Sequence, residues 1–468
     1  MNLIDIAIVV VYLVALFAWA IYIGLRENVE DFLILSRSAP LLLVTFSVIS
    51  TWVGTGTTVA TAASGYDKGI SLGVTAASGG LVGVLVAAWF APHLKWFGDK
   101  FQAHTIGDFF SARYSRQSGT AASALILLIY ALLTAAQFVG LTTLLHVWTG
   151  IPFEIVVWFA ALSTIIYTAF AGIKSDFYTD VIHFFVMFIV IFLILLPITI
   201  NEIGGLRGFQ ALPESYFNPF AYGGVSFFVA GLIFGGGSVF ITMEVWQRVY
   251  ASSSAKGAQR ALFCSIIIII GFYLVSSFFG MATRIITPNL LHRDQAIFFL
   301  MKQYLPSGIL GLGIAGFMAV FISTVNSTIM VASATLTKDF YKGIYFRAVD
   351  DKKLLIAGRV STLICGLMGL IVARLFPDLV ALSVNSLFML LILVPSIVGG
   401  FFWLKATSTG ALSSIITGSV VMLIFHAINP ETAFVAGFIA SLISFIIVSI
   451  FSNHSKDENL AIVRGWTK

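Results

Sequence analysis

The residues of this chain that could do chemistry are oxygen-bearing side chains inside long apolar stretches. In one such stretch, residues 52–58 contain two glycines and three threonines. Glycine costs about 1 kcal/mol in a helix interior, so this run is a poor helix. Unwound backbone at membrane depth persists only where it lines a cavity or binds something. We therefore expect freed carbonyl and hydroxyl oxygens here to face a ligand.

Two carboxylates, Asp180 and Glu244, also lie deep in apolar stretches. A charged group inside a bilayer is costly, so each is a functional-site hypothesis by default. Asp180 either contributes to a cation site or is a structural partner of Lys174 or Arg248. Glu244 lies close to Arg248 in the sequence, and we expect a salt bridge between them.

A second glycine run at 234–238 interrupts another apolar stretch. Close packing through small residues would explain either run alone. The two runs lie five spans apart, however, and an odd spacing inverts the second block relative to the first. A broken helix at the start of each of two inverted five-helix blocks is typical of secondary transporters with a binding site at the bilayer midplane.

The elements that must position these residues are membrane helices, because 59% of the 468 residues are hydrophobic and only 10% are charged. A soluble chain has about 25% charged residues, so a soluble enzyme, a disordered chain and a fibrous protein are excluded. A small disulfide scaffold is excluded because the chain has only two cysteines. Stretches long enough to span a bilayer predict an all-α membrane protein with about thirteen transmembrane helices. These are 3–25, 40–65, 70–92, 119–147, 151–172, 177–200, 223–246, 259–283, 307–337, 354–375, 377–402, 406–427 and 431–452.

The predicted spans divide the chain into four parts. Residues 1–37 form the first helix and an inner loop, and 38–222 form the first five-helix repeat, spans 2–6. Residues 223–403 form the second repeat, spans 7–11, and 404–468 add two helices and a cytoplasmic tail. The two cysteines, Cys264 and Cys365, both lie in apolar runs, and we expect buried free thiols.

The basic residues predict how the chain is oriented. With the N-terminus outside, 20 of the 26 Lys and Arg residues fall on the inner side and 6 on the outer side. Basic loops favour the cytoplasm, so we expect a multi-pass cell-membrane protein with its N-terminus outside and its C-terminus cytoplasmic. The net charge of +5 is spread among short loops. No basic stripe that would suit nucleic acid is present.

Three motifs carry a resemblance to a known family. Residues 178–183 resemble its Thr-Asp-Val-Ile-Gln run, with His183 where glutamine is usual, and 246–254 resemble its Gln-Arg-Val segment. Residues 323–327, followed by 337–341, resemble its serine-rich motif and the Asp-x-Tyr that follows. Over nearly its full length, the chain resembles the sodium/solute symporter family. This resemblance implies a leucine-transporter-type core made of the inverted 5+5 repeat, with spans 2 and 7 broken.

The resemblance also implies a sodium site. The family uses two carbonyls from the first broken helix, one carbonyl from the helix of the serine motif and two hydroxyls. In this sequence the site residues are Ser50, Val53, Val320, Ser323 and Thr324. The alternative is that the two hydroxyls bond back to carbonyls of their own helix.

Some family members have a second cation site below the first. Its possible counterpart in this sequence is Asp180, Ser323, Asn326 and Ser327. Asn326 stands where a serine or an aspartate is usual, and its amide oxygen adds no charge.

We expect the solute at the break of span 2, against span 7. The candidate lining residues are Trp52, Thr55, Gly56, Thr57, Gln137, Phe138, Thr142 and Thr242. No Arg or Lys lies in the middle of a span, so a carboxylate solute would lack a cationic partner. Trp52 either packs against its neighbours or faces a quaternary ammonium.

These expectations together predict a sodium-coupled symporter, not an enzyme, that takes up a small organic solute by alternating access, with Na+ as its cofactor. The alternative is a proton-coupled or uncoupled carrier, because His183 and Asp180 could relay protons. An ion channel would need a pore loop or a ring of charges, and a sensor would need an output domain after the last span. The expected partners are the solute, sodium and the lipid bilayer, with no nucleic acid and no obligatory protein partner.

Overall fold

The computed structural model describes residues 2–345, 350–376, 386–429, 433–454, 460 and 462. These residues form helices and no β-strand, with one isolated bridge between Ala39 and Ser252. Within the described residues, ten helices are long and apolar enough to cross a membrane, and two further spans are bent pairs. A shorter apolar helix at Ser386–Phe402 corresponds to the eleventh predicted span, whose first residues, 377–385, lie outside the described ones. The thirteen predicted stretches each correspond to one of these elements.

The single spans are α1 (Leu3–Gly24), α5 (Ser71–Phe101), α7 (Arg116–Thr149), α8 (Phe153–Phe170), α9 with η3 and α10 (Ile173–Glu202), α14 (Ala255–Ile286), α16 with η8 (Ile309–Lys342), α17 (Asp351–Leu375), α20 (Ser408–Ile428) and α21 (Ala433–Phe451). Two of the single spans run on into a π-helical segment, namely α9 into η3 and α16 into η8. The eleventh span contains η9 (Leu390–Leu393) and α19 (Val394–Phe402). Short helices in the connections include α2 (Val29–Ile34), α6 (Ile106–Arg113), α15 (Ala296–Tyr304), η4 (Leu206–Ala211) and η5 (Glu214–Phe217).

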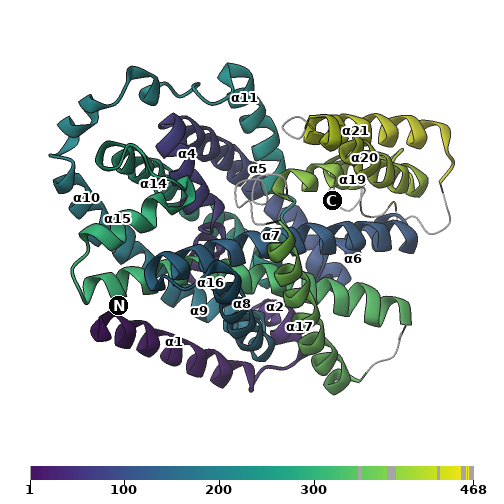
Figure 1. Cartoon of the computed structure of the whole chain (residues 1–468). Helices are drawn as coiled ribbons and strands as arrows, with labels where there is room; N and C mark the ends of the chain where they lie inside the picture. The colour runs from purple at the N-terminus through teal and green to yellow at the C-terminus, as the bar shows by residue number, and fades with distance from the viewer. Residues whose placement is uncertain are drawn as a thin grey trace.

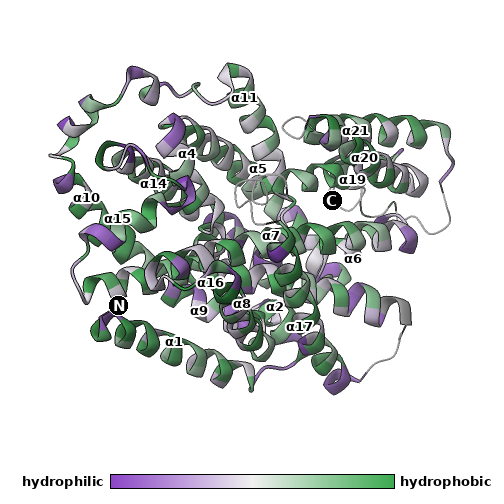
Figure 2. Cartoon of the chain, in the orientation of Figure 1, coloured by the Kyte–Doolittle hydropathy of each residue, from purple (hydrophilic) through white to green (hydrophobic). Residues whose placement is uncertain are grey.

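The helices are arranged around α16. Its most apolar window is 83% buried, whereas the corresponding window of α1 is 17% buried. Figure 1 shows α20 and α21 side by side at one edge of the molecule and α1 along another. These outer helices are coloured mostly as hydrophobic in Figure 2, as lipid-facing helices should be. A helix that carries polar residues can therefore cross the centre of the molecule while apolar helices surround it.

Small residues allow α16 to pack closely. A Cβ added at Gly316 would lie 2.6 Å from the side chain of Val190, and one at Gly311 would lie 2.7 Å from the backbone of Asp5. The Asp5 carboxylate at the start of α1 accepts hydrogen bonds from the backbone N–H groups of Gly308 (2.7 Å) and Gly311 (2.9 Å). It thereby satisfies amides at the beginning of α16 that have no partner within the helix.

The two bent spans are the second and the seventh, as predicted. The first consists of α3 (Leu41–Trp52), η2 (Gly56–Ala60) and α4 (Thr61–Lys68), with a bend of 57°. The second consists of α11 (Gly224–Ala230), η6 (Gly231–Gly235), α12 (Gly236–Val239) and α13 (Met243–Ala251), with a bend of 45°. The second break was predicted at 234–238 and this position is wrong. Those residues are helical, and the chain bends at 240–242 instead.

One of the two thiol predictions is also wrong. Cys365 is buried, but Cys264 is exposed on the outside of α14. Hydropathy identifies an apolar span without separating its lipid-facing side from its protein-facing side, because both sides are apolar.

Candidate functional site

The first break exposes backbone groups that polar side chains then satisfy. The Gln137 side-chain oxygen on α7 accepts from the Thr55 N–H (2.9 Å) and from the Thr55 hydroxyl (2.7 Å). The Thr57 hydroxyl donates to the carbonyl of Trp52 (2.8 Å), and the Thr58 hydroxyl donates to that of Gly54 (2.9 Å). The hydroxyls of Thr57 and Thr58, just after the glycines, are therefore internal caps for an unwound segment, since buried backbone groups require partners.

Two hydroxyls of α16 reach the end of α3 at this break. The Ser323 hydroxyl lies 3.0 Å from the carbonyl oxygen of Ser50 and 3.1 Å from that of Val320. The Thr324 hydroxyl lies 3.1 Å from the carbonyl oxygen of Thr51 and 3.2 Å from that of Val320. Three carbonyls and two hydroxyls from both repeats thus converge in a buried position. Neutral oxygens of this kind suit a small monovalent cation.

The predicted sodium ligands therefore largely lie together. The structure gathers Ser50, Val320, Ser323 and Thr324, and each hydroxyl bonds both to its own helix and across to α3. Among the described residues, the carbonyl hydrogen-bonded to Thr324 from the end of α3 is that of Thr51, not that of Val53. Val53 is fully buried at the end of α3.

A guanidinium lies beside this site and joins four helices. Nη2 of Arg248, on α13, contacts Asp176 (3.0 Å) and Asp180 (3.2 Å) on α9. The same nitrogen donates to the hydroxyls of Thr51 on α3 (2.6 Å) and Ser327 on α16 (2.7 Å). The Ser47 hydroxyl completes this Arg248 cluster, with contacts to Arg248 Nε (3.1 Å) and to Asp180 (2.6 Å).

The cluster settles which basic residue pairs with Asp180. Lys174 instead forms an ion pair with Asp31, at 2.9 Å. The expected Glu244–Arg248 salt bridge is wrong, because Arg248 faces the two aspartates and the hydroxyl of Tyr130 donates to the Glu244 carboxylate.

The residues proposed for a second cation site are only partly together. Asp180 and Ser327 both face Arg248, whereas the Asn326 amide contacts Thr168 (2.6 Å) and Tyr167 (3.1 Å) on α8. Asn326 is therefore turned away from Asp180. One carboxylate oxygen each of Asp176 and Asp180 is buried without a hydrogen-bond partner among the described residues. A second cation remains a hypothesis that these two oxygens support.

The predicted proton relay is not formed among the described residues. Nδ1 of His183 contacts the hydroxyl of Tyr12 on α1, at 2.8 Å, and no hydrogen bond joins His183 to Asp180.

A cavity of about 140 Å³ opens at the first break. Five of the eight predicted solute residues line it, namely Trp52, Gly56, Thr57, Gln137 and Thr242. Thr55 points to Gln137, and the hydroxyl of Thr142 donates to the carbonyl of Phe138 within α7. Thr55, Phe138 and Thr142 are thus buried next to the cavity wall and do not line it.

Sequence reasoning missed three important residues of this cavity: Glu244, Arg248 and Tyr273. Arg248 lines it even though no basic residue was expected at mid-membrane depth, because the predicted seventh span ended at residue 246 and left Arg248 in an inner loop. Tyr273 lies on α14, and its hydroxyl accepts from Nε1 of Trp52 at 3.3 Å. No local signal in the sequence joins these two aromatic residues.

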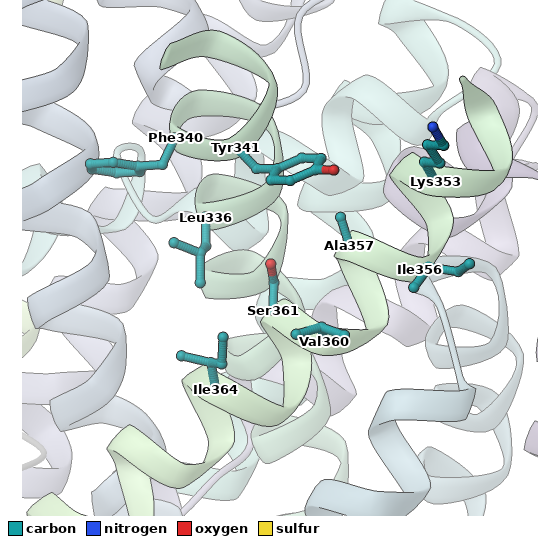
Figure 3. Close-up of a pocket in the computed structure, with 9 residues that line it drawn as sticks. All are labelled: Leu336, Phe340, Tyr341, Lys353, Ile356, Ala357, Val360, Ser361 and Ile364. Carbon is teal, nitrogen blue, oxygen red and sulfur yellow. The ribbon is translucent and has the colours of Figure 1, made fainter. Parts of the chain in front are cut away.

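A larger cavity, of about 490 Å³, lies far from this chemistry. Figure 3 shows it between the end of α16 with η8, which contributes Leu336, Phe340 and Tyr341, and the first half of α17. Its lining is almost entirely apolar, and Ile356 and Val360 on α17 are exposed on the outer surface. The smaller cavity is the better candidate for a solute, because polar groups from both repeats converge there.

Comparison with known proteins agrees with this arrangement. The sequence profile described as "Sodium:solute symporter family" matches residues 32–418. The sodium/pantothenate symporter of Haemophilus influenzae is 27% identical, over 95% of this chain and 96% of that protein. The sodium/proline symporter of Salmonella typhimurium is 25% identical, over 91% of this chain and 88% of that protein.

A solved structure shares the fold. The substrate-bound, outward-open state of a Na+-coupled sialic acid symporter matches with a TM-score of 0.84 and 19% identity, over 97% of this chain and 99% of that one. Bent second and seventh spans, hydroxyls and carbonyls that meet between the two repeats and a family match over most of the length all agree. The chain is a multi-pass membrane protein that belongs to the sodium:solute symporter family and couples solute uptake to sodium.

Proposed function

We propose that this protein takes up a small organic solute from outside the cell by binding it at the first break together with one sodium ion. The observation that carries the proposal is the contact of Ser323 and Thr324 with the carbonyls of Ser50 and Thr51. These contacts cross between the two repeats. A sodium ion held by the same oxygens would fasten the repeats together, and its release would let them separate.

Sodium coupling supplies the energy for accumulation. Each positive charge that moves inward gains about 2.3 kcal/mol per 100 mV of membrane potential. The ion site shares Thr51 and Thr324 with the lining of the solute cavity. Sodium therefore shapes the wall against which the solute binds, and the two ligands should stabilise each other's binding.

Removing the two hydroxyls tests the sodium site. The double substitution Ser323→Ala with Thr324→Ala should raise the sodium concentration needed for half-maximal solute binding by at least tenfold, about 1.4 kcal/mol. The measurement is sodium-dependent thermal stabilisation of the purified protein, together with transport in proteoliposomes. A matched control is Ser333→Ala with Thr335→Ala, whose hydroxyls bond to Gly358 and Val331 away from the break. An unchanged sodium requirement in the Ser323→Ala, Thr324→Ala protein would exclude this position as the sodium site.

The orientation with the N-terminus outside is part of the proposal. Its support is the excess of basic residues in the loops assigned to the inside, of which Arg347, Lys456, Arg464 and Lys468 lie outside the described residues. In a protein lacking Cys264 and Cys365, a cysteine at Arg207 should react with an impermeant maleimide in intact cells. A cysteine at Asn453 should react only after permeabilisation. The reverse pattern would invert the predicted topology.

A further inference from the structure

The cavity at the first break has two charged residues in its wall, Arg248 and Glu244. They differ in whether a group of opposite charge contacts them. Arg248 is in contact with two carboxylates, Asp176 and Asp180. One positive charge therefore faces two negative ones within the Arg248 cluster. This guanidinium has no positive charge left over for an anionic solute.

Glu244 is the opposite case. The hydroxyl of Tyr130 donates to its carboxylate, and among the described residues no ion pair with Glu244 forms. Glu244 is nevertheless part of the cavity wall and partly exposed to it. An ionised carboxylate at this depth without a cationic partner is costly. A cation that arrives with the solute would remove that cost.

The position of Glu244 in its helix lowers the cost of an ionised carboxylate there. It is the second residue of α13, which begins at Met243 after the break. The first turn of a helix carries unpaired N–H groups and a partial positive charge, which stabilise a nearby anion. The backbone N–H of Met243 also donates to the Tyr130 hydroxyl at 2.8 Å, which leaves the hydroxyl proton to point at Glu244.

Aromatic faces complete the cavity. Trp52 and Tyr273 both line it, and the hydrogen bond between them (3.3 Å) fixes the two rings relative to each other. Tryptophan and tyrosine rings attract cations through their electron-rich faces. The cavity volume of about 140 Å³ is well below the roughly 300–1,000 Å³ typical of sites for drug-sized ligands, so the bound group is small.

We propose that the transported solute carries a positively charged amine, and that Glu244 binds this ammonium group while Trp52 and Tyr273 cover it. The proposal rests on solute binding at the first break, as proposed above, and specifies the chemical class of the solute. Glu244 is then the residue that selects for charge. The sodium ion is held by separate, neutral oxygens.

The test compares small compounds of the same shape and different charge. One set is tert-butylammonium, tert-butanol and pivalate, and the second is isobutylammonium, isobutanol and isovalerate. Thermal stabilisation of the full-length protein in NaCl should require at least tenfold less of each ammonium compound than of its alcohol or carboxylate counterpart. Equal stabilisation within both sets, preference for the carboxylates, or no stabilisation by either ammonium compound would overturn the proposal.

A substitution at Glu244 identifies the residue responsible. Glu244→Gln keeps the size and the acceptor for Tyr130 but removes the charge, and should reduce the preference for ammonium to less than about threefold. Glu202→Gln makes the same chemical change at an exposed position, at the end of α10, and should leave the preference intact. A Glu244→Gln protein that is still stabilised by NaCl is folded. Full preference for ammonium in that protein would exclude Glu244 as the selecting residue.

The same measurements keep this proposal separate from sodium coupling. Repeating the titrations in KCl tests the proposed function, because a sodium symporter should bind its solute more weakly there. Loss of the difference between NaCl and KCl would contradict sodium coupling whatever the charge preference. Loss of the charge preference with the NaCl effect retained would contradict only the ammonium proposal. If Glu244 instead carries a proton, alcohols and ammonium compounds will bind equally well, which also overturns it.

Discussion

The two broken helices both contain glycines, yet these glycines act in different ways. In the first, a Cβ added at Gly54 would lie 2.7 Å from the Thr324 hydroxyl and 2.8 Å from the Gln137 side-chain oxygen. The glycine is therefore at the break itself, where other polar groups approach the backbone. In the second, the glycine run stays helical and packs against α5. A Cβ added at Gly236 would lie 2.7 Å from the side chain of Val82 on α5.

The second helix bends where side chains bind its freed backbone. Nε1 of Trp246 donates to the carbonyl of Phe240 at 2.8 Å, and the N–H of Met243 donates to the Tyr130 hydroxyl at 2.8 Å. At the first break, Gln137 and the threonine hydroxyls have this role. A break in a membrane helix is thus marked by partners for the backbone, since an unsatisfied group in lipid is costly. Glycine by itself indicates only close packing.

The largest expected effect comes from removing Arg248, which links the two broken helices through its contact with Thr51. Arg248→Ala should destabilise the folded protein by about 3–5 kcal/mol, because it leaves Asp176 and Asp180 buried without a counter-charge. Thermal denaturation of the purified protein would measure this. Adding Asp176→Asn and Asp180→Asn to the Arg248→Ala protein should recover part of the loss. A single variant as stable as the parent would show that the guanidinium is not the counter-charge.

A smaller effect is expected when the first break loses a backbone partner. Gln137→Leu removes the acceptor for the N–H and the hydroxyl of Thr55 and should cost about 1–3 kcal/mol of unfolding free energy. Thr143→Ala on the same helix is the control, because its hydroxyl bonds only to the carbonyl of Val139. Equal stability of the two variants would mean that the break needs no side-chain acceptor.

Alanine at a glycine of each broken helix compares the two directly. Gly235→Ala should be tolerated or stabilise by up to about 1 kcal/mol, because alanine favours a helix and the nearest atom to the new Cβ is 3.7 Å away. Gly54→Ala should impair sodium-dependent binding, because its Cβ would displace Thr324 or Gln137. Transport and sodium titrations of both variants are the measurement. Loss of transport in Gly235→Ala with normal function in Gly54→Ala would contradict the prediction that glycine is required at Gly54 and replaceable at Gly235.

The smallest expected effect concerns pH at the start of α9, the helix that carries both aspartates. Burial raises the pKa of Glu27 from 4.5 to about 7, although its carboxylate accepts from the N–H of Ser175 at 2.7 Å. Between these values the folded state binds more protons than the unfolded state, so Glu27 makes stability fall as pH rises from 4.5 to about 7. Glu27→Gln should flatten this part of the melting-temperature profile. A profile identical to that of the parent would exclude Glu27.

Much of the fold could be predicted because membrane helices have strong sequence signals. Apolar length gave the spans, and the serine motif of α16 identified the two hydroxyls that meet α3. The contacts that could not be predicted join side chains from segments that lie far apart in the sequence. Asp176 sits at the beginning of α9 and looks like an interfacial residue, but it pairs with Arg248 from the other repeat. The partner of Glu244 is Tyr130 on α7, and no spacing rule relates residues so far apart.

The first helix lies outside the two repeats, yet its Asp5 side chain has a structural role in the second one. Its carboxylate accepts from the amides of Gly308 and Gly311, so the helix that carries Ser323 and Thr324 is capped by α1. A transcript that starts translation after α1 would yield both repeats complete, but with α16 uncapped at its start. For anyone shortening or fusing the gene, the practical minimum unit therefore extends back to Asp5.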